Sequence, residues 1–184
     1  MEETKPRILV VYFSRSGTTR DVAHRLGALL GADLEEIEDP TPRSGWLGFL
    51  RCGYEAQRRQ LPTIAPANRE PGDYDIVVVG TPVWVASVSS PVRAYLRKHR
   101  GALRSAAFFC TCGGSGGRRA LEQMEEECGR PPVVRMQLRQ DDIGTVTADL
   151  AVERFVTRIL AAPAVAAGKI GDQNHTTGHH AARG

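Results

Sequence analysis

Cysteine is scarce in this 184-residue chain, and its spacing matches no familiar metal or redox pattern. There is neither a zinc-ligand arrangement nor a Cys-x-x-Cys pair among the four cysteines, which are Cys52, Cys110, Cys112 and Cys128. Disulfides are not needed, because a domain of this size with 41% hydrophobic residues buries roughly 70% of the surface that its unfolded form exposes. We therefore expect one domain with reduced thiols.

Long apolar runs are also missing, which argues against two further classes of protein. No run approaches the roughly 20 residues that a membrane-spanning helix needs, and residues 1–5 contain no apolar signal region. We expect a cytoplasmic protein without a membrane span. Residues 1–171 form the expected domain, whereas residues 172–184 lack large apolar side chains and are expected to form a disordered tail.

The chain lacks a strong excess of either charge. Its net charge is +3, and residues 43–70, with five arginines and two glutamates, account for this whole excess. A general nucleic-acid binder usually carries a broader basic surface, so we expect no nucleic-acid partner. The arginine-rich segment includes an apolar helical pattern around residues 45–59, which either packs on a sheet, reaches over a ligand site or contacts a second subunit.

Three continuous apolar runs are typical of strands that are buried on both faces of a parallel sheet. They cover residues 8–13, 74–80 and 106–111. Two weaker, mixed patterns at residues 34–38 and 134–138 indicate strands at the edges of that sheet. The sequence therefore predicts five strands.

Amphipathic helical patterns separate these strands. The first helix is expected to end at Gly31 and the third at Gly129, and Pro91 marks the start of the second. Inward positions are expected for Val22, Leu26, Leu29, Leu30, Val92, Tyr95, Leu96, Leu121, Met124, Val152, Phe155, Val156, Ile159 and Leu160. The alternation predicts an α/β fold with a doubly wound five-stranded parallel sheet of order 2-1-3-4-5. Ligands bind such sheets at the carboxyl ends of the first and third strands.

Each of the three central strands is followed by a turn of distinctive composition. The first turn is rich in hydroxyl groups and precedes a helix, an arrangement that suits a phosphate, and it consists of Ser14, Arg15, Ser16, Gly17, Thr18 and Thr19. The second presents a proline and an aromatic ring in Thr81, Pro82, Val83, Trp84 and Val85. The third lets the backbone approach a flat ligand and includes Thr111, Cys112, Gly113, Gly114 and Gly116. Together the turns predict a slot for a planar ring with a phosphate at one end.

In these turns the chain resembles the flavodoxin-like family of FMN-binding proteins, and the resemblance covers residues 7–160. The other two turns are similar to the family's second and third flavin loops, and its first motif, Ser/Thr-x-Ser/Thr-Gly-x-Thr, is matched by Ser14, Ser16, Gly17 and Thr19. The resemblance implies FMN as the cofactor, with its phosphate in the first turn and its isoalloxazine ring between the other two. It is also compatible with a homodimer, for which residues 46–54 are the candidate contact.

Structural roles are the alternative for several of these residues. Trp84 is alternatively a core aromatic, the first turn only a helix cap, and Cys112 a small residue placed there for packing. No residue in the turns stands out as a general acid or base, so we predict no catalytic side chain. This suits flavin chemistry, because hydride transfer depends mainly on the alignment of donor and ring.

Other phosphate-binding motifs fit less well. Gly17 is followed by Thr18 and not by lysine, and no Gly-x-Gly-x-x-Gly follows a strand, which argues against a triphosphatase loop and a dinucleotide domain. Residues 112–118 form a Cys-x5-Arg string that resembles the loop of cysteine phosphatases, with Cys112 as nucleophile and Arg118 as oxyanion clamp. That alternative leaves the first turn without a role.

Two features favour an enzyme over a one-electron carrier of this family. The carriers tend to have a glycine in the second loop, where a peptide flip stabilises the semiquinone, and acidic residues around the ring. This chain has no glycine between Thr81 and Ser90, and its turns are flanked by positive charge that favours an anionic reduced flavin, from Arg15, Arg20, Arg118 and Arg119. We expect an FMN-dependent reductase that takes electrons from NAD(P)H or a redox protein and passes them to a quinone or another small acceptor. The alternatives are a non-catalytic flavodoxin-type carrier and a flavin-binding sensor or interaction module.

Overall fold

The computed structural model describes residues 6–38 and 64–162, and strands alternate with helices in this part of the chain. The strands are β1 (Ile8–Tyr12), β2 (Asp33–Glu36), β3 (Ile76–Trp84), β4 (Ser87–Val88), β5 (Ala106–Cys112) and β6 (Arg135–Arg139). The helices are α1 (Thr18–Leu30), α3 (Ser90–His99), α4 (Gly117–Cys128) and α5 (Val146–Leu160), with short 3-10 helices η1 (Pro71–Asp73) and η2 (Gln140–Asp142). The helix expected around residues 45–59 and the tail expected at residues 172–184 lie outside the described residues.

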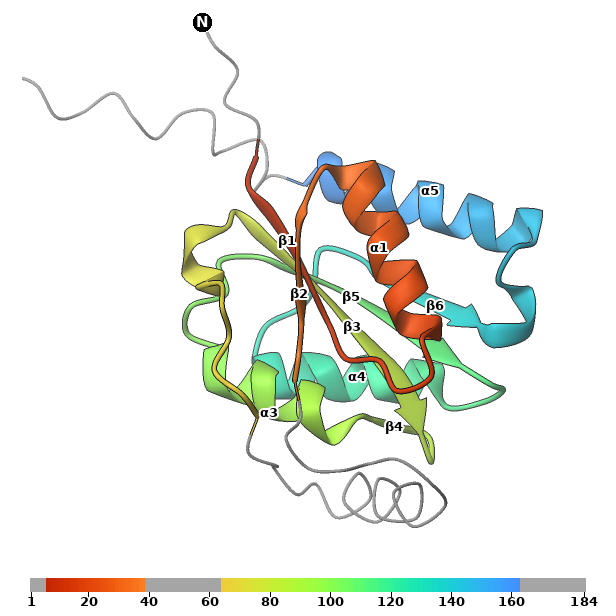
Figure 1. The fold of residues 1–184 in the computed structure, drawn as a ribbon, viewed down its shortest axis with the longest axis horizontal. Coiled ribbons are helices and arrows are strands. Elements are labelled where there is room, and N and C mark those ends of the chain that lie inside the picture. Colours follow the sequence, from red (N-terminus) through yellow and green to blue (C-terminus); the bar gives the residue numbers. More distant parts are fainter. Residues whose placement is uncertain (1–5, 39–63, 163–184) are drawn as a thin grey trace, which may run out of the picture.

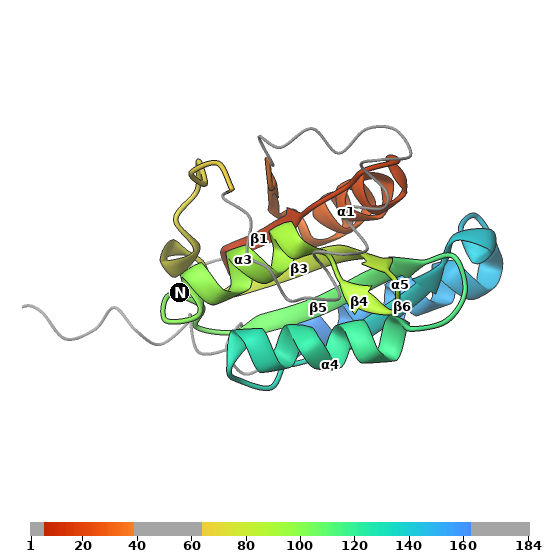
Figure 2. The same cartoon turned by 90° about the horizontal axis from the view of Figure 1, so that it is seen from below.

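Five parallel strands form the sheet in the order β2-β1-β3-β5-β6, and β4 pairs antiparallel with the end of β3. Val10 of β1 lies beside Val78 of β3, which in turn lies beside Ala107 of β5. Helices α1 and α5 cover one face of the sheet, and α3 and α4 cover the other (Figure 1, Figure 2). The predicted doubly wound order is confirmed, with β4 as an additional short strand.

Each face of the sheet carries its own hydrophobic core, because successive side chains of a strand point to opposite faces. Leu9, Val77 and Phe108 belong to the core on the α3 and α4 side, whereas Val10 and Phe109 belong to the core on the α1 and α5 side. All five side chains are fully buried. The central strands are therefore buried on both faces, as their continuous apolar runs predict.

Two of the expected inward helix positions are wrong. Leu29 and Leu160 are 50% and 47% exposed, although each directly neighbours a buried residue, Leu30 or Ile159. Consecutive helix residues point about 100° apart, so a leucine next to the buried stripe can face solvent. The expected helix ends are confirmed, because Gly31 and the residue Gly129 both adopt left-handed conformations after α1 and α4.

The described helices also bear on the membrane question. Within residues 6–38 and 64–162, none of them has the length and apolar character needed to cross a bilayer.

Candidate functional site

The three turns singled out by the sequence converge at the carboxyl edge of the sheet, where β1, β3 and β5 end side by side (Figure 1). Direct contacts join them. Thr19 Oγ1 of the first turn lies 2.8 Å from Thr111 Oγ1 at the start of the third. A Cβ added to Gly116 in the third turn would lie 2.5 Å from Ala86 Cα in the second, so these two backbones touch. The predicted site residues therefore lie in one region of the molecule.

The first turn leaves the N-terminus of α1 open to an anion. Gly17 precedes the helix with a φ of 97°, and no side chain caps the helix. The turn is closed by the Gly17 N–H, which donates to Ser14 Oγ over 3.2 Å, and the first helical bond runs from Asp21 N to Gly17 O. The N–H groups of residues 18–20 consequently have no acceptor inside the helix.

Space and hydroxyl groups surround this helix end. Apart from its two chain neighbours, no atom of residues 6–38 or 64–162 lies within 4 Å of a Cβ placed on Gly17. The hydroxyls of Ser16 and Thr18 lie 3.4 Å apart beside the open N–H groups. The helix dipole and these donors favour negative charge at this point, so the residues present fit the phosphate of FMN.

A buried hydrogen bond holds the first turn to the sheet. Thr19 and Thr111 are 2% and 1% exposed, and their hydroxyls bond to each other. The pair joins the N-terminus of α1 to β5. Because neither hydroxyl reaches water, each depends on the other for its hydrogen bond, and the bond fixes the first turn relative to the third.

The second turn is a hairpin, and the loop predicted from the sequence is wrong in extent. The strand expected to end at Gly80 continues to Trp84. Thr81 and Pro82 still pair with β5, and the next two residues, Val83 and Trp84, pair with β4. Four of the residues expected in a loop are therefore strand residues, namely Thr81, Pro82, Val83 and Trp84.

Only Val85 and Ala86 form the turn of this hairpin. Their φ angles are 50° and 54°, which is the left-handed region in which glycine and asparagine are usual. Two consecutive residues in that region are typical of a type I′ turn, whose twist matches that of paired strands. The turn thus holds two ordinary side chains in an unfavourable backbone conformation, at the edge where the three turns meet.

Trp84 packs as a core aromatic, which is the structural alternative stated for it above. Its side chain is 8% exposed, and its ring meets that of Phe13 edge to face with centroids 5.5 Å apart. Val85 at the tip of the hairpin is 60% exposed. Of the two, Val85 is therefore the apolar side chain that is available to a ligand in this conformation.

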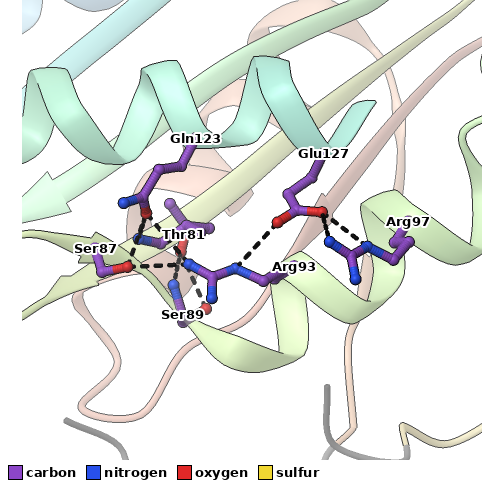
Figure 3. A network of polar contacts seen from close by, with 8 residues as sticks. Thr81, Ser87, Ser89, Arg93, Arg97, Gln123 and Glu127 are labelled. Carbon is purple, nitrogen blue, oxygen red and sulfur yellow. Dashed lines mark hydrogen bonds and ion pairs between the residues drawn. The ribbon is translucent and has the colours of Figure 1, made fainter. Parts of the chain in front are cut away.

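A buried polar network fastens the hairpin to α3 and α4 (Figure 3). Gln123 Oε1 accepts hydrogen bonds from Ser87 Oγ over 2.7 Å and from Val88 N over 3.0 Å. Arg93 Nη2 donates to Ser87 Oγ over 3.0 Å and to Gln123 Oε1 over 3.3 Å. Both residues of β4 are consequently bonded to the same glutamine.

The same network contains a buried ion pair. Arg93 is 1% exposed and Glu127 5% exposed, and Arg93 Nε lies 3.5 Å from Glu127 Oε1. Arg97 adds a second cation, with Nη2 at 2.7 Å from Glu127 Oε2. Sequence reasoning missed this network, because Arg93 and Gln123 are 30 positions apart and belong to no local motif.

The third turn exposes backbone and buries its cysteine. Cys112 is 2% exposed, and its Sγ donates toward Gly114 O at 3.5 Å and Leu138 O at 3.7 Å. These contacts agree with the packing alternative for Cys112. A Cβ at Gly114 would meet no described atom within 4 Å, so a ligand has access to the backbone of this turn.

This geometry does not favour the cysteine phosphatase alternative. The Cys112 thiol points toward backbone carbonyls, whereas Arg118 is 90% exposed and lies 3.6 Å from the Glu122 carboxylate. An attacking thiolate and an oxyanion clamp need to face one point.

The described part of the chain also contains no cluster of three or more His, Cys, Asp or Glu side chains that could hold a metal ion.

Charge next to the first turn is more balanced than the sequence suggests. Arg20 Nη2 lies 2.8 Å from Glu36 Oε1, which offsets part of its positive charge. Glu36 Oε2 also accepts from Tyr12 OH over 3.3 Å, and His24 Nε2 lies 3.2 Å from the same hydroxyl. Burial, and then the charge of Glu36, raise the pKa of Tyr12 above its usual value.

Comparison with known proteins identifies the family. The family model described as Flavodoxin matches residues 7–138, and the chain belongs to this family. Among curated proteins, none matches the chain.

Solved structures share the fold at low sequence identity. A flavoprotein from Lactobacillus acidophilus in complex with FMN is 19% identical, with 79% of this chain and 98% of that chain covered and a TM-score of 0.65. A protein from Bacteroides eggerthii described as a candidate flavoprotein is 22% identical, with 85% and 99% covered and a TM-score of 0.68. Two-electron reduced flavodoxin from Megasphaera elsdenii is 17% identical, with 84% and 99% covered and a TM-score of 0.52.

Proposed function

We propose that this chain binds FMN at the carboxyl edge of the sheet and works as an FMN-dependent NAD(P)H:quinone-type reductase. The observation that carries the FMN assignment is the N-terminus of α1, which Gly17 opens and no side chain caps. The FMN complex of the Lactobacillus acidophilus protein, which shares the fold, supports it. A cytoplasmic location, expected from the sequence, is part of the same proposal.

The chain's own residues divide the binding work. The N–H groups of residues 18–20 and the hydroxyls of Ser16 and Thr18 hold the phosphate. The Val85–Ala86 turn and the exposed backbone at Gly114 border the ring from two sides. Bound FMN supplies the redox chemistry, accepting hydride from the donor and passing electrons to the acceptor. The protein keeps the ring and the donor aligned.

The hairpin favours an enzyme over a one-electron carrier. Its turn contains no glycine, and both of its residues already occupy the left-handed region. β4, which follows the turn, is bonded to Gln123 and Arg93. A backbone held in this way presents one conformation to the ring, which suits repeated two-electron transfer with small molecules better than a turn that rearranges on each electron.

Titration of the purified protein with FMN, followed by anaerobic reduction with NADPH or NADH, tests this function. We expect a yellow complex that bleaches directly when the nucleotide is added and recovers its colour with a quinone. A stable blue intermediate spectrum on stepwise reduction, with no reaction with either nucleotide, would favour the carrier. Tight FMN binding without turnover of any donor and acceptor would favour a sensor.

A variant at the first turn tests the binding site separately. In Thr18→Asp a carboxylate occupies the first position of α1, where it stabilises the helix but repels a phosphate. We expect FMN affinity to fall by at least about tenfold, whereas riboflavin, which lacks the phosphate, binds the variant and the unaltered protein equally. An unchanged FMN affinity, or an equal loss of both ligands, would count against a phosphate at this turn.

A further inference from the structure

The network behind the hairpin contains a buried charge, the guanidinium of Arg93. Arg93 is 1% exposed and pairs with Glu127, and the free energy of burying a guanidinium can exceed what such a pairing returns. In its buried position Arg93 also orients its neighbours, because Arg93 Nη2 donates to Ser87 Oγ and Gln123 Oε1. Both contacts lie on or against β4, the returning strand of the hairpin.

The base of the hairpin has a second fastening. Thr81 Oγ1 accepts from Ser89 N over 3.1 Å and bonds to Ser89 Oγ over 3.0 Å. With Gln123 bonded to Ser87 and Val88, three successive residues of the returning chain are therefore fixed by side chains. Figure 3 shows these groups gathered between β4, α3 and α4.

The fastening reaches the third turn as well. Gln123 lies on α4, and the N-terminus of that helix follows Gly116, whose backbone touches Ala86 at the hairpin tip. Helix α4 thus holds β4 through the Gln123 side chain, and the backbone before this helix restricts movement of the hairpin tip. The two turns that border the proposed ring site are in this way held as a single unit.

We propose that Gln123 and Arg93 are positioning residues for the flavin ring, because they fix the Val85–Ala86 turn against residues 113–117 before the ligand arrives. This inference rests on the proposed FMN site. Neither residue lies in the turns themselves, so they act through β4 and not by contact. A turn that is fixed in advance loses little conformational entropy on binding, which increases affinity and holds the ring in one orientation.

The principal test uses Gln123→Leu in the full chain, with Gln123→Glu as the conservative partner. Leucine removes the acceptor for Val88 N and Ser87 Oγ, whereas glutamate keeps an oxygen in place beside Arg93. We expect the Kd for FMN to rise about tenfold in Gln123→Leu and to stay within about threefold in Gln123→Glu. The visible circular dichroism of bound FMN should change in the first variant and persist in the second.

Hydrogen exchange at the Val88 amide measures the same fastening without FMN. This amide donates to Gln123 Oε1, so its exchange should speed up about tenfold or more in Gln123→Leu. Val152→Ala is the stability control, because Val152 is 1% exposed in the core on the opposite face of the sheet. We expect it to lower the melting temperature while leaving FMN affinity and the dichroism unchanged.

Several outcomes would overturn the inference. If Gln123→Leu loses stability as Val152→Ala does but keeps its FMN affinity and dichroism, Gln123 has only a structural role. If Gln123→Leu does not fold, Ser87→Ala replaces it. This variant loses the hydrogen bonds of Ser87 Oγ to Gln123 and Arg93, so we expect the Kd to rise about threefold, and an unchanged Kd counts against the proposal. Failure of the unaltered chain to bind FMN removes both the site and the inference, whereas FMN binding without NAD(P)H turnover removes only the reductase.

Discussion

The N-termini of α1 and α4 have the same local geometry and opposite surroundings. Each helix follows a glycine in the left-handed region, with φ of 97° at Gly17 and 95° at Gly116, and neither is capped by a side chain. A Cβ at Gly17 would meet no described atom within 4 Å, whereas one at Gly116 would collide with the backbone of Ala86. Gly17 therefore faces open space, whereas Gly116 is in close backbone contact with the hairpin.

The difference shows how one local motif serves two purposes at the same edge of the sheet. An uncapped helix end with space in front of it is suited to receive an anion. An uncapped helix end that packs against a neighbouring turn has no space for a ligand in front of its glycine. The glycine there permits a close approach of two backbones. Local sequence alone does not separate the two cases, because the neighbour at Ala86 comes from a distant part of the chain.

Gly116→Ala is expected to give the largest effect in this comparison. The new Cβ meets Ala86 Cα, and the alanine must also keep a left-handed backbone, so we expect a loss of about 2–4 kcal/mol in the free energy of unfolding. FMN affinity should fall as well, because the hairpin tip must move. Urea denaturation and FMN titration measure the two effects.

Two further glycines provide matched controls for Gly116. Gly17 and Gly144 also have positive φ, at 97° and 90°, but a Cβ at either would meet no described atom within 4 Å. Their alanine variants should lose only the backbone cost, about 1 kcal/mol each. Equal losses at all three positions would mean that the contact with Ala86 does not matter, and the contrast between the two helix ends would then disappear.

Removal of the bond between Thr19 and Thr111 is expected to have the next largest effect. Either single change to valine leaves a buried hydroxyl without its partner and should cost about 1–2 kcal/mol of stability. The double variant should cost clearly less than the sum of the two, because no unpaired hydroxyl is then left. Additive losses in urea denaturation would show that the two hydroxyls are not coupled, and that the first and third turns are held together by other contacts.

The contrast also explains how far the sequence could predict the site. The strand order and the three turns were predictable, because apolar runs end at hydroxyl or glycine clusters whose meaning is local. The hairpin was not, because Val83 and Trp84 extend β3 only where β4 returns beside them. Arg93 was not either, since nothing in its helix indicates that its partners are Ser87, Gln123 and Glu127.

A titratable group beside the first turn offers a smaller test. Tyr12 has a raised pKa, mainly through burial and then through Glu36, so the folded protein keeps this proton at pH values where the unfolded chain releases it. Its contribution to stability is therefore complete below pH 10 and is lost as the pH rises from there through the raised pKa. Tyr12→Phe should reduce the alkaline loss of stability, measured by urea denaturation between pH 9 and 11, without abolishing it, because burial raises the pKa of Tyr95 as well.

Surface charge at the two helix ends should give the smallest effect. Near α1, Arg20 is paired with Glu36, and on α4 Arg118 lies 3.6 Å from Glu122, but the first turn of α4 contains a second cation, Arg119, and no acidic residue. If the proposed reductase takes its electrons from NADPH, removal of both α4 arginines by alanine should raise the KM for the nucleotide about two- to fivefold at low salt, and the difference should shrink as salt screens the charges. FMN affinity and the free energy of unfolding should stay unchanged, because both side chains are exposed. Arg20→Ala is the matched variant at the other helix end. Because Glu36 already offsets the charge of Arg20, this variant should change the KM less. An equal change would mean that the donor responds to the net charge of this edge of the sheet and not to the end of α4.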